Sequence, residues 1–319
     1  MAYDCETALL ASKLKDELLV HPIILSAGSF ALSIFISQAV YSTFDWRPVA
    51  ICVSADILTI GLDHYKDQAP SLVDALNNAS TRVLQVFYHA RILLLLSTTL
   101  LCVALSHSPP ETWMITGIFI APALLWNTPL SIRIPGHSSQ NEFPTEKDQQ
   151  KPEGAFVIKR IPGMKALFIG IIRGCGTFAV VHSILASSTM APNVQDNMFT
   201  STQILMWSTA NRTCHAVMAD IRDFQEDWEN QIPTIPVLLK SVYKTRVLLT
   251  LIHIATMIFF LQNPYIFLAS VYAIALVWLL GDKTPKKFFR FSFHSQTIVA
   301  CLYGIVESFK YLAHTHKFL

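Results

Sequence analysis

Charged residues are scarce in this sequence. Asp, Glu, Lys and Arg make up 14% of the 319 residues, against about 25% in an average soluble domain. Hydrophobic residues make up 52%, and the mean hydropathy is +0.42. A chain with so little charge and so much apolar surface is not typical of a soluble enzyme. The composition predicts a polytopic membrane protein that contacts a lipid bilayer.

Three further absences narrow the classes of function. No dense basic tract accompanies the small net charge of +2, which argues against nucleic-acid binding. The six cysteines are scattered without any C-x-x-C spacing, so neither a disulfide framework nor a zinc site is indicated. The N-terminus has no basic start and no small-residue cleavage site of a signal peptide. Leucines instead recur there at helical spacing, which predicts an amphipathic helix over residues 1–21 at the membrane surface.

Apolar segments close to the roughly 20 residues of a membrane-spanning helix follow this N-terminal segment. They are residues 22–41, 48–62, 84–105, 113–132, 164–186, 200–219, 244–261, 263–281 and 291–312. We therefore expect an all-α bundle of nine transmembrane helices over residues 22–319. The stretch 131–155 is polar and rich in turn-forming residues, which predicts a mobile loop insert and not a second domain.

Basic residues fall mainly on one side of this predicted topology. Of the 24 Lys and Arg residues, 18 lie in the N-terminal segment and in the loops near 63–82, 131–165, 221–246 and 282–290. Loops with such an excess face the cytoplasm in most membrane proteins. We expect a multi-pass protein of the endoplasmic reticulum with these loops in the cytosol.

An acidic stretch follows the sixth apolar segment. Asp220, Asp223 and Asp227 have the i, i+3, i+7 spacing that puts side chains on one face of a helix, and Pro233 and Pro236 then end the helix. Carboxylates on one face suit Mg²⁺, which takes oxygen ligands and shares them with substrate phosphates. The alternative is a solvated acidic helix end.

Two motifs give the sequence a family resemblance. The pattern D-x-x-D-x-x-x-D at 220–227, followed by T-x-P-V at 234–237, resembles the second aspartate motif of the UbiA-type membrane prenyltransferases. The stretch K-R-I-P-G-M-K at 159–165 resembles the start of helix five in that family. The resemblance implies nine transmembrane helices around a central cavity, with aspartate motifs on cytoplasmic loops after helices two and six.

The first aspartate motif departs from the family pattern, N-D-x-x-D-x-x-x-D followed by N-K-P-x-R-P. Asp67 and Asp74 match its second and last acidic positions, while Lys66 and Pro70 replace the asparagine and the middle aspartate. Asp63, one helical turn before Asp67, can supply a further carboxylate. The resemblance then implies six Mg²⁺ ligands, namely Asp63, Asp67, Asp74, Asp220, Asp223 and Asp227. It also implies four groups that pair with the substrate diphosphate, namely Lys159, Arg160, Lys165 and Arg82.

The reaction implied by the resemblance begins with Mg²⁺-dependent ionisation of an isoprenyl diphosphate, with Asp220, Asp223 and Asp227 as the catalytic carboxylates. The altered first motif looks most like a fungal branch of membrane sesquiterpene cyclases. We therefore expect a terpene cyclase, a carbon–oxygen lyase of secondary metabolism that turns farnesyl diphosphate into a bergamotene-like hydrocarbon. The alternative is a prenyltransferase with an aromatic or other small-molecule acceptor. A catalytically silent scaffold or carrier is a third reading.

Ionisable and aromatic groups near the predicted cavity leave two questions open. Asp56, Arg91 and Arg173 lie inside predicted spans, where a charge is costly unless it is paired or lines a wet cavity. Either a structural ion pair or a functional role fits them. Aromatic faces can shield a carbocation, and four aromatic residues are placed for this or for a membrane-interface belt: Tyr65, Trp126, Phe168 and Trp207.

The topology can be checked by labelling single cysteines from the cytosolic side. We expect cysteines at Ser138 and Lys283 to react and a cysteine at Pro192 to be protected. The loop around Pro192, residues 187–199, contains no Lys or Arg, as expected of the opposite side. Protection of Ser138 together with labelling of Pro192 would invert the topology.

Overall fold

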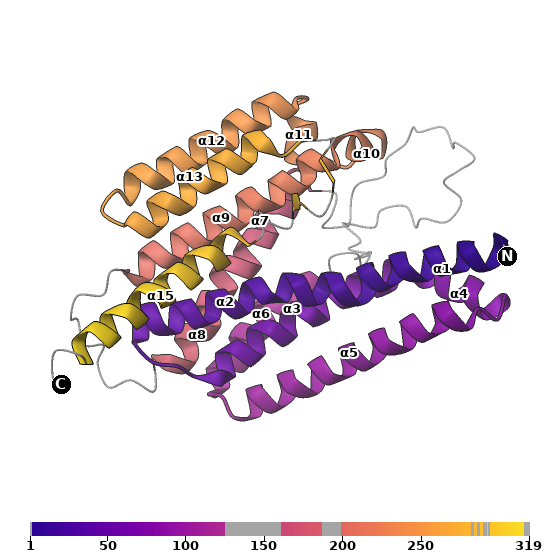
Figure 1. Ribbon diagram of the computed structural model, residues 1–319, viewed down its shortest axis with the longest axis horizontal. Helices are drawn as coiled ribbons and strands as arrows, with labels where there is room; N and C mark the ends of the chain where they lie inside the picture. The colour runs from indigo at the N-terminus through magenta and orange to yellow at the C-terminus, as the bar shows by residue number, and fades with distance from the viewer. Residues whose placement is uncertain are drawn as a thin grey trace, which may run out of the picture.

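A computed structural model of the protein describes residues 2–124, 161–186, 199–281 and 294–315, and positions 284, 285, 288, 289 and 292. These residues form helices without any strand (Figure 1). The α-helices and two π-helical segments, η1 and η3, have the following bounds: α1 (Ala2–Lys15), η1 (Asp16–Val20), α2 (His21–Tyr41), α3 (Trp46–Asp67), α4 (Ala69–Asn77), α5 (Thr81–Ser106), α6 (Pro110–Leu124), α7 (Met164–Gly170), η3 (Ile171–Gly176), α8 (Thr177–Leu185), α9 (Ser201–Arg222), α10 (Phe224–Glu229), α11 (Ile235–Leu238), α12 (Val242–Phe259), α13 (Pro264–Leu279) and α15 (Ser295–Thr315).

The all-α prediction is confirmed over the described residues. Each predicted apolar segment contains a helix in its described part, and the predicted insert at 131–155 lies outside that part. Four helical runs of the described chain are long and apolar enough to cross a membrane: Glu6–Tyr41, Thr81–Ser106, Met164–Leu185 and Val242–Phe259. Pro264–Leu279 is also apolar but shorter.

Polar residues cap the starts of two of the long helices, α3 and α9. The Asp45 carboxylate accepts a hydrogen bond from the backbone N–H of Arg47 and caps α3. Thr200 and Gln203 form a capping box at the start of α9. Such caps satisfy backbone N–H groups that have no partner within the helix. At these two helices, residues next to the boundary in sequence mark where the helix begins.

The N-terminal segment is helical, as predicted, but it does not end at residue 21. Helix α1 continues through η1 into α2 without a break, so residues 2–41 form one run. Leu14 and Leu18 are buried against Val83 and Phe87 of α5. The inner face of this segment is therefore covered by the protein itself, and its position at a membrane surface remains a prediction.

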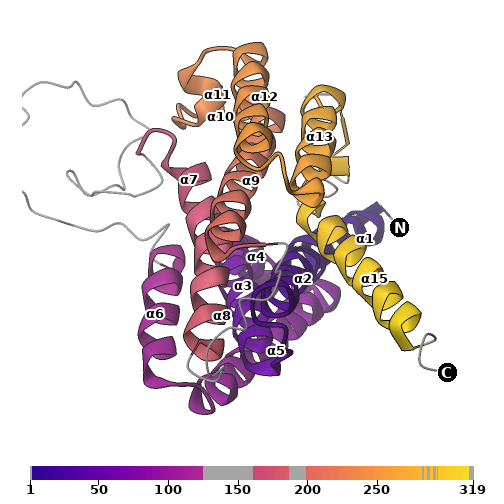
Figure 2. The same ribbon diagram turned by 90° about the vertical axis from the view of Figure 1, so that its left-hand side faces the viewer.

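The helices pack as two groups that meet at α8 and α15. Helix α2 packs on α3 and α3 on α5, while the α7–η3 run packs on α9 and α12 on α13. Helix α15 contacts both α2 and α13 and closes the bundle between the groups, as Figure 2 shows. The α3 helix and the α7–η3 run thus face each other across the middle of the bundle.

Two glycines allow the α7–η3 run to approach α9 closely. Gly170 and Gly174 are four residues apart and therefore lie on one helix face. A Cβ atom on Gly174 would lie 2.6 Å from the Cα of Thr209 and 2.9 Å from the carbonyl carbon of Ser208. These are backbone atoms that cannot rotate away. Small residues permit such contacts between helices in membranes.

We expect Gly174→Ala to destabilise the protein and Gly117→Ala to leave it unchanged or slightly more stable. Overpacking against a fixed backbone costs about 1–3 kcal/mol. Gly117 lies in α6, and a Cβ atom there would meet no neighbouring atom within 4 Å, so alanine gains only helix propensity, about 1 kcal/mol at most. Thermal unfolding in detergent compares the two variants. Equal melting temperatures would show that the close contact with α9 does not limit stability.

Candidate active site

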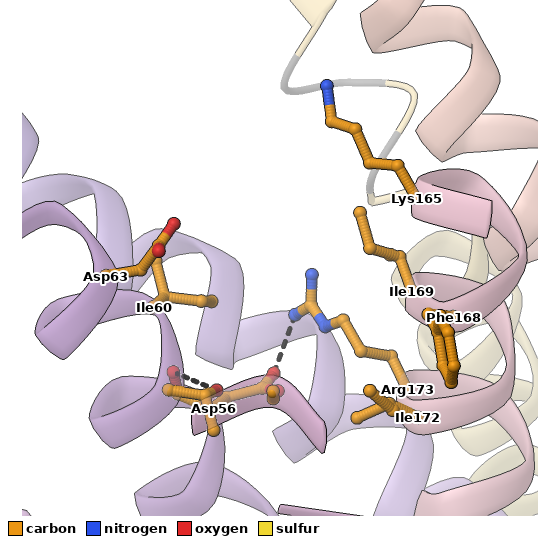
Figure 3. A pocket seen from close by; sticks show the side chains of 10 residues that line it. Asp56, Ile60, Asp63, Lys165, Phe168, Ile169, Ile172 and Arg173 are labelled. Atoms are coloured by element: carbon orange, nitrogen blue, oxygen red, sulfur yellow. Dashed lines mark hydrogen bonds and ion pairs between the residues drawn. The ribbon is translucent and has the colours of Figure 1, made fainter. Parts of the chain in front are cut away.

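A pocket of about 210 Å³ lies between α3 and the α7–η3 run (Figure 3). Most of its wall is apolar, formed by Ile60, Ala123, Phe168, Ile169 and Ile172. Charged residues lie at two levels. Asp63 and Lys165 point outward at one end, and Arg173 reaches across toward Asp56 further in, as the figure shows. An apolar space with charge at its mouth suits a ligand with an apolar body and a charged head.

Lys165 connects this pocket to the acidic stretch. Its Nζ donates a hydrogen bond of 2.7 Å to Oδ1 of Asp220, whose side chain is only 1% exposed. Burial raises the pKa of Asp220 to about 6, although the Lys165 ammonium opposes that shift. Asp223 and Asp227 also act electrostatically on Lys165. The Lys165 ammonium is therefore hydrogen-bonded to one of the three predicted catalytic carboxylates and interacts electrostatically with the other two.

The local chain path holds Lys165 in place. Gly163 has a φ of +68°, a conformation that glycine adopts readily, and it precedes the first residue of α7. Its N–H donates to the carbonyl of Pro233 at 2.9 Å. Pro233 follows the acidic stretch, so the hydrogen bond joins the two sequence motifs in space.

The three aspartates do not lie on one uninterrupted helix, in contrast to the prediction. Helix α9 ends at Arg222, and α10 begins at Phe224. Asp223 lies at the junction, where its carboxylate accepts a hydrogen bond from Nε of Arg222 at 2.6 Å. The spacing of the three aspartates does not predict this partner, because it takes no account of Arg222 beside Asp223.

Asp227 and Thr234 are two buried polar residues that lie near each other at the end of the acidic stretch. Asp227 is 5% exposed and Thr234 is 2% exposed. Within the described residues neither Oδ2 of Asp227 nor Oγ1 of Thr234 makes a hydrogen bond of normal geometry. Burial raises the pKa of Asp227, but the Thr234 hydroxyl lies close enough to the Asp227 carboxyl to oppose that rise by hydrogen bonding. A carboxylate has more acceptor sites than one hydroxyl can occupy, so the Asp227 carboxylate retains capacity to bind a ligand.

The predicted first motif is divided by the structure. Asp63 lines the pocket together with Lys165. Asp67 is exposed at the end of α3, and Arg82 is exposed at the start of α5. Asp74 is also exposed and lines a separate depression beside α1. Lys159 and Arg160 lie outside the described residues. In the described part of the chain, no three Asp, Glu, His or Cys side chains converge closely enough to form a metal site by themselves.

Asp56 and Arg173 form an ion pair that the sequence alone did not identify. Nη2 of Arg173 lies 2.6 Å from Oδ2 of Asp56, across 117 positions of sequence. The same nitrogen donates to the Leu25 carbonyl at 2.6 Å, and the Ser29 hydroxyl donates to Oδ2 of Asp56 at 2.6 Å. Ionisable residues inside predicted spans were the only sequence signal for this cluster.

The aromatic candidates divide between the pocket and the core. Phe168 lines the pocket. Trp207 packs in the core, edge-on to Phe35. Tyr65 contacts Phe87 and accepts a hydrogen bond from Arg91 at 2.7 Å. Trp126 lies outside the described residues, so Phe168 is the aromatic side chain of the described chain that is placed to face a ligand.

Comparison with solved structures decides the fold. A UbiA homologue from Archaeoglobus fulgidus bound to GPP and Mg²⁺ matches with a TM-score of 0.54 at 10% identity, covering 92% of this chain and 98% of that chain. The same homologue bound to DMAPP and Mg²⁺ matches with a TM-score of 0.53 at 10% identity, over the same shares of the two chains. The chain has the UbiA fold. No protein-family model and no curated protein sequence matches it. The UbiA fold is thus retained here at a level of identity at which the sequence comparisons find nothing.

We expect Lys165→Met to lower the melting temperature of the protein in detergent. The substitution leaves Asp220 buried without its counter-charge, which costs about 3–5 kcal/mol for a fully buried pair and less here, because the Lys165 side chain is 32% exposed. Adding Asp220→Asn should restore part of the loss, as a double-mutant cycle would show. Lys244→Met, at an exposed lysine of α12, is the control. Additive effects of the two site substitutions would contradict the pairing.

Proposed function

We propose that the protein is a membrane-embedded enzyme that ionises an isoprenyl diphosphate with the help of Mg²⁺. The observation that carries this proposal is the pocket itself. Its mouth has Lys165 and Asp63 beside the buried acidic stretch, and its wall is apolar. Two structures of the matching UbiA homologue contain Mg²⁺ together with GPP or DMAPP. A diphosphate head and an isoprenyl chain fit these two parts of the pocket.

The residues at the mouth fit Mg²⁺. This ion is usually held by one or two carboxylates, several waters and substrate phosphates, and not by a full protein cage. Asp220 and Asp227, which reach the mouth through Lys165 and do not line the pocket themselves, would supply such carboxylates, so the absence of a cluster of three among the described residues does not exclude the ion. When bound, Mg²⁺ would neutralise the departing diphosphate. The remaining predicted ligands, Asp63 and Asp223, belong to the same proposal.

The protein side chains supply binding, orientation and a dry cavity. Lys165 lines the mouth and donates to phosphate oxygens in a charge-assisted hydrogen bond. Ile60, Ile169 and Ile172 contact the isoprenyl chain and keep water from the allylic cation that ionisation leaves. The ring of Phe168 can face that cation and attract it electrostatically. Lys159, Arg160 and Arg82 are further proposed partners of the diphosphate.

The proposal extends to a terpene cyclase that acts on farnesyl diphosphate and forms a sesquiterpene hydrocarbon of the bergamotene type. It is supported by the altered first motif, since Asp67 and Asp74 lie away from the pocket. A transferase would need to admit a second substrate and place it within bonding distance of the cation. The proposal includes nine membrane spans, the endoplasmic reticulum membrane and a cytosolic active site.

Purified protein given farnesyl diphosphate and Mg²⁺ alone should release diphosphate together with a volatile sesquiterpene hydrocarbon. An added aromatic acceptor should not accelerate the release. The reason is that a distal double bond of the substrate's own isoprenyl chain attacks the cation. Diphosphate assay and gas chromatography of the extract measure both products. Release that requires the acceptor, with an alkylated ring as the only prenyl product, would establish the transferase instead.

Two variants connect that release to the acidic stretch. Asp227→Asn should lower turnover by about 100-fold or more, the effect of losing one preorganised charge contact. Glu226→Gln is the matched control, since Glu226 is the exposed neighbour of the buried Asp227. Chelation with EDTA should abolish release, and added Mg²⁺ should restore it. Full turnover of Asp227→Asn at equal expression would remove the acidic stretch from the mechanism.

A further inference from the structure

The Asp56–Arg173 pair lies along the pocket wall and not only at its end. Asp56, Thr59 and Ile172 line both the main pocket and a second one of about 40 Å³, which continues toward Ile51 and Val180. Asp56 precedes Asp63 on α3 by seven residues, which is about 10 Å along a helix. The hydrocarbon chain of a ligand that extends inward from the pocket mouth would therefore pass Asp56.

Two helical segments, α2 and η3, hold the Asp56 carboxylate of α3. Its Oδ2 accepts hydrogen bonds from Ser29 of α2 and from Arg173 of η3, and Arg173 is fixed in turn by the Leu25 carbonyl. Oδ1 accepts no hydrogen bond from the residues that the structure describes. The carboxylate thus has one oxygen that is held and one that is available at the junction of the two pockets.

Binding of a hydrocarbon chain does not require charged residues in the inner part of the pocket, where Asp56 and Arg173 lie. An ion pair inside an apolar bundle carries a desolvation cost that its own attraction often does not repay. Asp56 and Arg173 are 8% and 7% exposed, and a third charged group, the buried Arg212, lies within electrostatic range of both. Asp56 is therefore a single negative group held beside two positive ones. A carbocation that must lose a proton does give a reason for such a carboxylate.

We propose that Asp56 is the base that ends the reaction, with Ser29 and Arg173 as positioning residues. The C–H bond next to the cationic carbon breaks, and its electron pair forms the carbon–carbon double bond of the product. The proton moves to Oδ1 of Asp56 and passes to water when the product leaves. Because a carbocation is a very strong acid, a carboxylate paired with a guanidinium is basic enough. This inference rests on the proposed ionisation of an isoprenyl diphosphate.

The first test is Asp56→Asn, which keeps the side-chain shape and an oxygen for Ser29 and Arg173 but removes the base. Farnesyl diphosphate and Mg²⁺ are supplied, and diphosphate and organic products are measured in the same sample. We expect diphosphate release to persist, because that bond breaks at the mouth. The wild-type hydrocarbon should fall at least about tenfold per diphosphate released, with water-quenched alcohols or other isomers in its place. An unchanged product spectrum would overturn the proposal.

A second variant covers the case in which Asp56→Asn does not fold. Ser29→Ala retains the ion pair but frees the carboxylate from one of its two donors, so the ratio of hydrocarbon to other products should change at least about twofold. Ser26→Ala is the matched control on the same helix, because the Ser26 hydroxyl bonds only to the Ile23 carbonyl of its own turn. Identical products from Ser29→Ala and Ser26→Ala would also overturn the proposal. Failure of the proposed function shows differently, as a wild-type protein that releases no diphosphate.

Discussion

The pairing of charges inside an apolar helical bundle is the constraint on which this structure depends. A lone charge in such an interior would be expensive, so the charged groups at the pocket pair with groups on other helical segments. Lys165 of α7 reaches Asp220 of α9, and Arg173 of η3 reaches Asp56 of α3. Together the two pairs hold the α7–η3 run from both sides. The pocket lies between the helices that these pairs connect, so the same contacts that orient the helices also shape the site.

The α7–η3 run is built for this double role by its two faces. Lys165, Ile169, Ile172 and Arg173 recur at helical spacing and line the pocket. Gly170 and Gly174 lie on the other face and allow contact with the backbone of α9. Close packing on α9 brings Lys165 within reach of Asp220. A larger residue at either glycine would therefore disturb the Lys165–Asp220 contact at the mouth of the pocket, although neither glycine lines the pocket.

Local patterns in the sequence predict the helices and supply the candidate motifs of the site. Contacts between segments that are distant in the sequence could not be predicted from it. Apolar segments locate the helices, and the structure brings the motifs at 159–165 and 220–227 together through Lys165 and Asp220, while their common role in a site stays a prediction. The break at Asp223 depends on a particular arginine beside it. The exposure of Asp67 and Asp74 depends on where α3 ends and α4 turns. The pairing of Asp56 with Arg173 spans 117 positions and follows only from helix packing.

The depth of the charged groups gives the proposed reaction its order. In that proposal Lys165 at the mouth, together with the acidic stretch that it contacts through Asp220, acts on the diphosphate, which must depart first. The carboxylate of Asp56 lies about two helical turns from Asp63 at the mouth, where the proposed binding mode puts the hydrocarbon part of the substrate. Separation of this kind keeps the deep carboxylate away from the metal and the diphosphate, both of which would compete for it. A pocket with charge at the mouth alone could start a carbocation reaction. A second charged group deeper in the pocket, Asp56, also provides a defined place for that carbocation reaction to end.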